Sequence, residues 1–241
     1  MNIYKYASPT MFYPLAGKMI PWFAIPAAIL FAAGMYVGFF IAPTDFQQGD
    51  AYRIIFIHVP AAWMAMFLYV LMAIYAGVGW AFNARLASMM ASAIAITGTI
   101  FTLLSLVTGA LWGKPTWGTY WAWDARMTST LILFFLYIGF ISLQSAIDDT
   151  RRADRAGAVL ALVGVINVPI IYFSVQWWNT LHQGATIRIL GKPSIAPPML
   201  AAMLIMLAAC WLYSVAVVLV RLRCIILERE QNAARFVEVN A

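Results

Sequence analysis

Six long stretches without a formally charged residue constrain the fold of this chain more than any other feature. They are 26, 31, 28, 21, 32 and 28 residues long and cover residues 19–44, 54–84, 86–113, 127–147, 156–187 and 193–220. A helix needs about 20 apolar residues to cross the hydrocarbon core of a bilayer. Each stretch can therefore supply one membrane span, and the sequence predicts spans at about 20–41, 57–80, 89–111, 128–147, 157–177 and 198–220.

The composition also indicates an integral membrane protein. The chain is 64% hydrophobic and only 10% charged, whereas soluble domains carry about 25% charged residues. The stretches lack the alternation of barrel strands, and lipid does not tolerate unpaired backbone groups, so helices are expected. We predict an all-α protein with six transmembrane helices and a single domain over residues 1–241. No polar domain is present to carry a basic face, so membrane topology explains the net charge of +6 better than nucleic-acid binding does.

The distribution of lysine and arginine predicts the orientation of the spans. Ten of these residues fall on the side that holds both termini and the 81–88 and 148–156 connections. The other side holds five, namely Arg53, Lys114, Arg126, Arg188 and Lys192. Because cytoplasmic loops carry the excess of positive charge, both termini are predicted to be cytoplasmic. The 42–56, 112–130 and 178–197 segments then lie outside, which is the periplasm if the protein sits in a bacterial inner membrane.

The segment 112–130, WGKPTWGTYWAWDARMTST, is unusually aromatic. It contains Tyr120 and four of the ten tryptophans, Trp112, Trp117, Trp121 and Trp123. Such rings favour the membrane–water interface, so one interpretation is an aromatic belt that anchors helix ends. The other is a flat platform for a large apolar ligand. If residues 117–124 are helical, Trp117, Tyr120, Trp121 and Asp124 share one face. Asp124 is expected to organise hydrogen bonds for an indole N–H or for Arg126, rather than to act as an acid.

The two histidines, His58 and His182, fall on the same predicted side as this segment. Two neutral imidazoles can ligate the iron of a haem from opposite faces, while aromatic rings cover the porphyrin. Arg53 and Arg126 would suit the propionates, because a guanidinium binds carboxylate bidentately. The alternative is that these histidines are polar interfacial residues and that the arginines extend toward water.

Other classes of site and activity are less consistent with the sequence. Zinc prefers three or four ligands, and this side offers two His, no Cys and three aspartates. The spans contain no formal charge, which disfavours an ion-coupled transporter. No phosphate-binding loop is present, so a partner would have to hydrolyse ATP, and no enzyme activity is assigned. The chain lacks CxxCH, and histidines on one side only disfavour a b-type electron carrier.

Segment 112–130 resembles the WWD signature of the haem-handling proteins of cytochrome c maturation. HVPAAW at 58–63, WDARMTS at 123–129 and WWNTLHQG at 177–184 extend the resemblance over essentially the whole chain. Within that superfamily, the chain is similar to the CcmC family, which has six spans and this signature between the third and fourth. Tyr120 stands where an indole is common.

The resemblance implies that haem b is bound as cargo at the periplasmic face, with His58 and His182 as axial ligands. The haem-binding set that it implies also contains Trp112, Trp117, Tyr120, Trp121, Trp123, Asp124, Arg53, Arg126 and Gln183. It implies delivery to the haem chaperone CcmE, in a complex with the ATP-binding-cassette subunits CcmA and CcmB and the small protein CcmD. Asp45, Gln48 and Arg53 in the first outer loop are expected to contact a partner. Two alternatives remain open: a bundle that conducts haem across the membrane, and a structural subunit with an aromatic belt.

Overall fold

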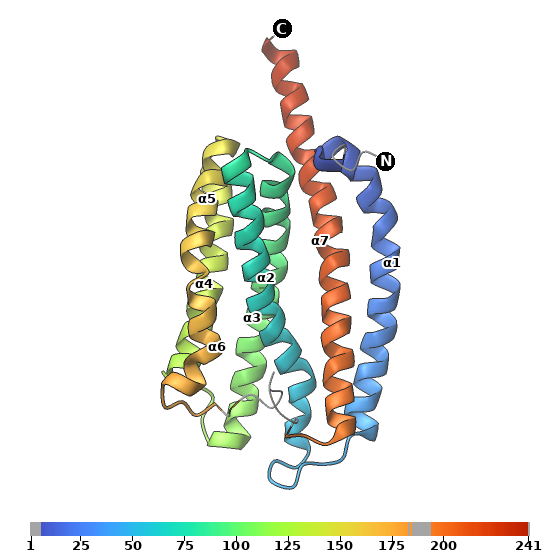
Figure 1. The fold of residues 1–241 in the computed structure, drawn as a ribbon, viewed down its shortest axis with the longest axis vertical. Helices are drawn as coiled ribbons and strands as arrows, with labels where there is room; N and C mark the ends of the chain where they lie inside the picture. Colours follow the sequence, from blue (N-terminus) through green and yellow to red (C-terminus); the bar gives the residue numbers. More distant parts are fainter. Residues whose placement is uncertain (1–5, 183, 185–193, 241) are drawn as a thin grey trace.

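The computed structural model describes residues 6–182, 184 and 194–240, which form a bundle of long helices (Figure 1). The long helices are α1 (Pro9–Tyr36), α2 (Ile55–Phe82), α3 (Arg85–Trp117), α4 (Ala125–Ala146), α5 (Thr150–Gly164), α6 (Asn167–Trp177) and α7 (Pro197–Asn240). A π-helical turn, η2 (Val37–Ile41), extends α1, and a 3-10 turn, η3 (Asp50–Ile54), precedes α2. Six of the described helical segments are long and apolar enough to cross a membrane. The predicted all-α membrane fold is confirmed.

Most helices extend beyond the predicted spans. The first helical segment begins at Pro9 rather than near residue 20, the second begins at Asp50, and α7 continues far past residue 220. Charged residues mark where a chain leaves lipid, but they do not end a helix. The observed ends follow backbone conformation instead: Asn83 after α2 and Gly118 after α3 are left-handed, with φ of 50° and 79°.

The fifth predicted span, 157–177, is divided between α5 and α6, with a turn at residues 165–166. Pro169 lies one turn beyond Val165 and has no backbone N–H to donate, which favours a break at this point. The side chain of Asn167 donates to the carbonyl of Ser129 at 2.8 Å. The break is therefore attached to α4, and α6 can hold a direction of its own.

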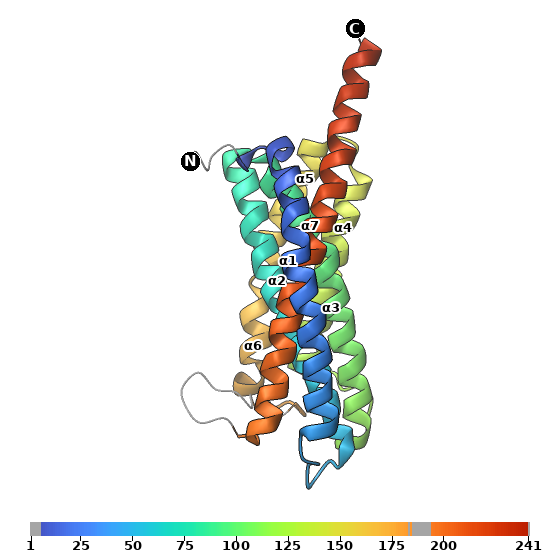
Figure 2. The ribbon, with the colours of Figure 1, turned by 90° about the vertical axis from the view of Figure 1, so that its right-hand side faces the viewer.

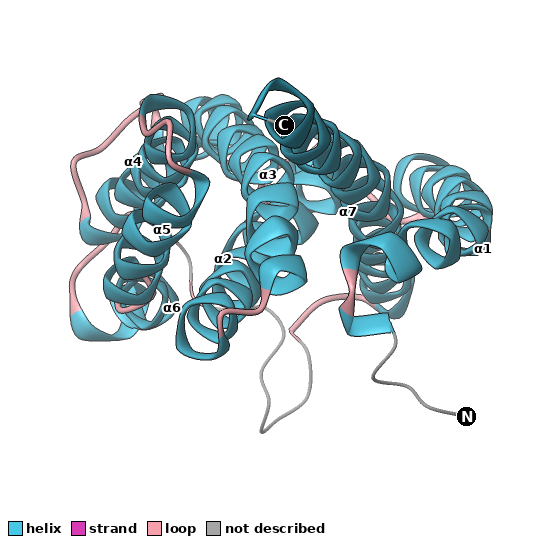
Figure 3. Ribbon diagram, turned by 90° about the horizontal axis from the view of Figure 1, so that it is seen from above, coloured by secondary structure: helices cyan, strands magenta, loops and turns pink. Residues whose placement is uncertain are grey.

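The core of the bundle lies between α2, α3, α4 and α5. At its centre the rings of Tyr69 and Tyr137 meet edge to face, with centroids 4.9 Å apart, and both side chains are fully buried. Helix α1 packs on α7 at one side of the molecule (Figures 1 and 3).

Both described chain ends lie at one end of the bundle, and the three connections singled out by the sequence lie at the opposite end. Figures 1 and 2 show the start of α1 and the end of α7 at the upper end of the bundle, where α7 projects beyond the other helices. The connections from η2 to η3, from α3 to α4 and after α6 are at the lower end. This arrangement brings His58, the Trp-rich segment and His182 to the same end.

Candidate functional site

The Trp-rich segment is a helix end followed by an irregular connection. The possibility that residues 117–124 form a helix is therefore wrong. Helix α3 continues through Pro115 to Trp117, and the left-handed Gly118 ends it. Residues 119–124 are not helical. Asp124 then caps α4, because its Oδ1 accepts from the N–H of Met127 at 2.8 Å. Trp117 and Asp124 consequently do not lie on a common helical face.

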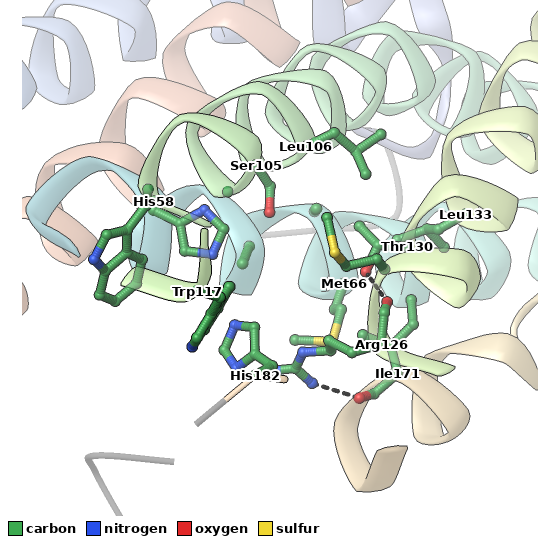
Figure 4. A pocket seen from close by; sticks show the side chains of 15 residues that line it. His58, Met66, Ser105, Leu106, Trp117, Arg126, Thr130, Leu133, Ile171 and His182 are labelled. Carbon is green, nitrogen blue, oxygen red and sulfur yellow. Dashed lines mark hydrogen bonds between the residues drawn. The ribbon is translucent and has the colours of Figure 1, made fainter. Parts of the chain in front are cut away.

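A cavity opens at this end of the bundle between α2, α3, α4, α6 and the segment after α6. Its volume is about 50 Å³. Figure 4 shows the side chains around it. The lining residues are His58, Ala62, Ala65, Met66, Ser105, Leu106, Gly109, Trp112, Trp117, Arg126, Met127, Thr130, Leu133, Ile171 and His182.

Both histidines line this cavity, and their ring centroids are 6.2 Å apart. His58 comes from the first turns of α2 and is 7% exposed, whereas His182 comes from the chain after α6. Metal–imidazole bonds are about 2.0–2.1 Å long, so two imidazoles on opposite sides of one metal have centroids roughly 6 Å apart. The spacing fits two ligands of one metal, and the described residues contain no cluster of three or more His, Cys, Asp or Glu that could hold an ion alone.

Two of the predicted platform rings accompany the histidines. Trp112 contacts His58 edge to face at 5.7 Å between centroids, and Trp117 lies 5.9 Å from His182. The other predicted rings lie outside the cavity lining. Tyr120 and Trp123 are 56% and 77% exposed, and Trp121 packs edge to face against Trp123. Their part in a platform stays a prediction.

The two arginines have different surroundings. Arg126 lines the cavity and donates to the backbone carbonyl of Ile171, which joins α4 to α6 (Figure 4). Arg53 donates to the carbonyls of Gly38 at 2.6 Å and Ala42 at 3.1 Å, and its Nε pairs with Asp50 at 2.9 Å. It holds the end of the first span to the start of the second. Arg53 is outside the cavity lining, and its predicted role toward a propionate is not tested by this arrangement.

The first outer connection reaches the site through one side chain. Gln48 Oε1 accepts from the indole Nε1 of Trp112 at 2.7 Å. Asp45 Oδ1 shapes the connection by accepting from the backbone N–H groups of Gln47 and Gln48, at 2.9 and 2.8 Å. A contact of Asp45, Gln48 and Arg53 with a partner stays a prediction, and Gln183 lies outside the described residues.

Three residues of α3 at the site were not identified from the sequence: Ser105 and Gly109 line the cavity, and Thr108 contacts His58. They recur with the predicted Trp112 at intervals of three and four along α3, so the four residues share one face. Thr108 Oγ1 lies 3.0 Å from Nδ1 of His58. The periodic signal was present, because small and polar residues recur one helical turn apart before Trp112. The sequence does not predict that this face of α3 packs against the first turns of α2.

Known proteins resemble the chain over nearly its whole length. A family model described as heme exporter protein C matches residues 2–237. The heme exporter protein C of Escherichia coli (strain K12) is 45% identical over 231 residues, which cover 96% of this chain and 93% of the relative. That of Bradyrhizobium diazoefficiens is 45% identical over 240 residues, covering 100% and 91%. A mitochondrial protein of Marchantia polymorpha, whose name connects it as ccmC-like with cytochrome c biosynthesis, is 47% identical over 162 residues, covering 67% and 68%. On this similarity, the chain belongs to the heme exporter protein C family.

Proposed function

We propose that this chain binds haem as cargo at the bundle end that holds His58 and His182, and passes it to a chaperone for cytochrome c maturation. The observation that carries the proposal is the pair of imidazoles at one cavity, with centroids 6.2 Å apart. The names of the relatives, which describe haem export and cytochrome c biosynthesis, support the same cargo.

Each lining group has a distinct part in this proposal. The porphyrin supplies four ligands to the iron, so His58 and His182 need only supply the two axial ones. Trp112 and Trp117, which already contact the imidazoles, pack against the ring. The guanidinium of Arg126 lines the same cavity and pairs with a propionate. The chain assists by positioning, and no acid–base step is assigned to it.

The cavity must open before haem can enter. Its volume of about 50 Å³ is enough for only a few water molecules and far too small for a porphyrin. Helices α2 and α3 pack along their length, whereas His182 lies on a connection. We propose that residues 178–182, which carry His182 directly after α6, move outward to admit the ring. A partner that binds the open arrangement more tightly favours release.

The proposed site faces the periplasm, and its partners act from both sides of an inner membrane. The chaperone CcmE receives the haem outside, the subunits CcmA and CcmB supply ATP hydrolysis, and CcmD completes the complex. The first outer connection is the proposed contact, through Asp45, Gln48 and Arg53. Phe46 at its tip is 92% exposed, which gives that surface an apolar centre.

Conduction of haem through the bundle is less well supported. Ala65 and Leu133 line the deep end of the cavity. One helical turn further from the site, Tyr69 on α2 and Tyr137 on α4 are fully buried against each other. A route for haem toward the other end would have to separate these rings.

The proposal is tested by the absorption spectrum of protein purified after co-expression with its partners. Wild type should carry low-spin haem, and His58→Ala and His182→Ala should each lose haem or shift its Soret band. Identical spectra for all three proteins, or absence of haem from all of them, would contradict the proposal.

A pair of tryptophan variants separates a platform from a general membrane anchor. Trp117 contacts His182, while Trp80 near the far end of α2 is 48% exposed. Trp117→Ala should lower haem retention several-fold, and Trp80→Ala should leave it unchanged. Equal losses in the two variants would favour an aromatic belt.

A further inference from the structure

We infer that Thr108 is a positioning residue that holds His58 in one tautomer, with the proton on Nδ1 and the lone pair on Nε2. Thr108 lies on α3, fifty residues further along the chain, and its Oγ1 is 3.0 Å from Nδ1 of His58. The inference rests on the proposed haem site for its functional meaning, but the tautomer itself is a property of the protein without haem.

The position of the hydroxyl proton decides the direction of this hydrogen bond. Thr108 Oγ1 lies 2.6 Å from the carbonyl oxygen of Leu104. Hydrogen bonds between oxygens span about 2.5–3.0 Å, and a carbonyl can only accept. The single hydroxyl proton of Thr108 therefore points to Leu104. Its oxygen can then only accept from His58, so Nδ1 must be the protonated ring nitrogen.

The neighbouring residue leaves room for the imidazole in this orientation. A Cβ atom added at Gly109 would lie 3.0 Å from Cε1 of His58 and 3.5 Å from Nδ1. Any larger residue would press on the ring edge that joins its two nitrogens. Trp112, one turn further along α3, contacts the same imidazole edge to face. Thr108 and Trp112 thus contact the ring and Gly109 leaves room for it, and His58 is buried among them. The backbone of Ser105, on the same helix face, is a further hydrogen-bond partner of His58.

The tautomer of His58 decides which of its ring nitrogens can ligate the iron. A neutral imidazole binds a metal through its unprotonated nitrogen, and a hydrogen bond from the other nitrogen fixes the tautomer and ring direction. With Nδ1–H committed to Thr108, Nε2 is the ligating atom of His58, and it is available without a proton having to leave. Thr108 acts on haem only through His58.

The tautomer can be measured in haem-free protein. His58 is the only imidazole left in a His182→Gln variant, because the chain has two histidines. Nitrogen-15 NMR of histidine-labelled His182→Gln protein should show protonated Nδ1 and bare Nε2. Adding Thr108→Val should produce a substantial population protonated on Nε2, and Thr108→Ser should restore the original tautomer. Protonation of Nε2 in the His182→Gln parent, or an unchanged tautomer in Thr108→Val, would overturn the inference.

Thr102→Val supplies a matched control on the same helix. Thr102 is fully buried and donates to the carbonyl of Gly98 at 2.7 Å, as Thr108 does to Leu104, but within the described part of the chain its hydroxyl does not bond to a histidine. It should not alter the His58 nitrogen signals. A change as large as that in Thr108→Val would show that loss of any helix hydroxyl suffices, and would overturn the specific role of Thr108.

Haem retention separates this inference from the function on which it rests. In the otherwise wild-type chain, loss of such a supporting hydrogen bond weakens metal binding by about 10-fold or more. Thr108→Val should therefore lose haem faster than wild type, with Thr108→Ser close to wild type. If His58→Ala leaves the haem spectrum unchanged, the proposed function fails even where the tautomer is as inferred. If His58→Ala loses the ligand but Thr108→Val retains haem normally, the positioning role fails and the proposed function stands.

Discussion

The carboxylate of Asp124 joins the start of α4 to the chain that carries His182, because its Oδ2 accepts from the backbone N–H of Leu181 at 3.1 Å. Its other oxygen caps α4 by accepting from Met127. One side chain therefore fixes both the end of the Trp-rich segment and the residue next to a proposed iron ligand. Asp124 was expected to organise hydrogen bonds, and the groups that it joins are backbone N–H groups rather than an indole or Arg126.

Asp124→Asn should loosen the His182 segment without unfolding α4. Asparagine is a good helix N-cap, so its oxygen can still accept from Met127. Its amide nitrogen cannot accept from Leu181 and would face another donor. We expect haem retention to fall several-fold while the Tm of the purified protein changes little. Asp149→Asn is the control, since Asp149 caps α5 in the same way by accepting from the backbone N–H of Arg152. Equal effects of the two substitutions on haem retention would refute the link.

Gln48→Leu should disturb the site from the first outer connection. The indole N–H of Trp112, a side chain only 4% exposed, would lose its acceptor. An unsatisfied buried donor costs about 1–3 kcal/mol. We expect a lower Tm and weaker haem retention, with Gln48→Glu closer to wild type because a carboxylate also accepts.

Gln47→Leu, one residue away, tests whether any apolar substitution in this connection has the same result. It should behave like wild type in both measurements. If it matches Gln48→Leu, the bond between Gln48 and Trp112 is not the cause.

Arg126→Lys should impair the binding of haem through its propionates. Lysine keeps the positive charge but lacks the planar fork that would serve both the Ile171 carbonyl and a carboxylate. The binding of haem should weaken, while the binding of its dimethyl ester should be alike in wild type and variant. If the variant binds haem and the dimethyl ester more weakly to the same degree, Arg126 acts only by joining α4 to α6.

The membrane spans and the chemical character of the site could be predicted from the sequence, but most of the geometry of the site could not. Charge-free stretches locate the spans because lipid excludes charge. This exclusion acts on each segment by itself, whichever helices pack against it. The end of α3 at Gly118 and the break before Pro169 depend on backbone conformation, which hydropathy does not encode. The roles of Arg53 and Thr108 depend on which helices touch. Arg53 donates to the carbonyls of Gly38 and Ala42 and to Asp50, contacts that the sequence does not predict, and its role toward a propionate stays a prediction.

The hydroxyl of Tyr69 should be the reason why no residue larger than glycine fits at position 164. A Cβ atom added at Gly164 would lie 2.1 Å from Tyr69 Oη, and the next nearest atoms, both of Leu136, are at 3.1 Å. Overpacking in a closed core costs about 1–3 kcal/mol, so Gly164→Ala should lower the Tm. Tyr69→Phe removes the clashing atom, which is a buried hydroxyl without a hydrogen-bond partner among the described residues. That substitution alone should be neutral or slightly stabilising.

The double variant decides whether this single contact is responsible. Gly164→Ala combined with Tyr69→Phe should recover most of the lost Tm, since residues in direct contact have non-additive effects of about 0.5–3 kcal/mol. Gly139→Ala on α4 is the control, because its added Cβ would meet only a methyl of Leu160 at 3.2 Å, and Tyr69→Phe should not alter its effect. Strict additivity for Gly164→Ala and Tyr69→Phe would mean that the cost arises elsewhere along the break between α5 and α6. Recovery would identify the Tyr69 hydroxyl as the atom that requires glycine at the end of α5, where the fifth span changes direction toward the site.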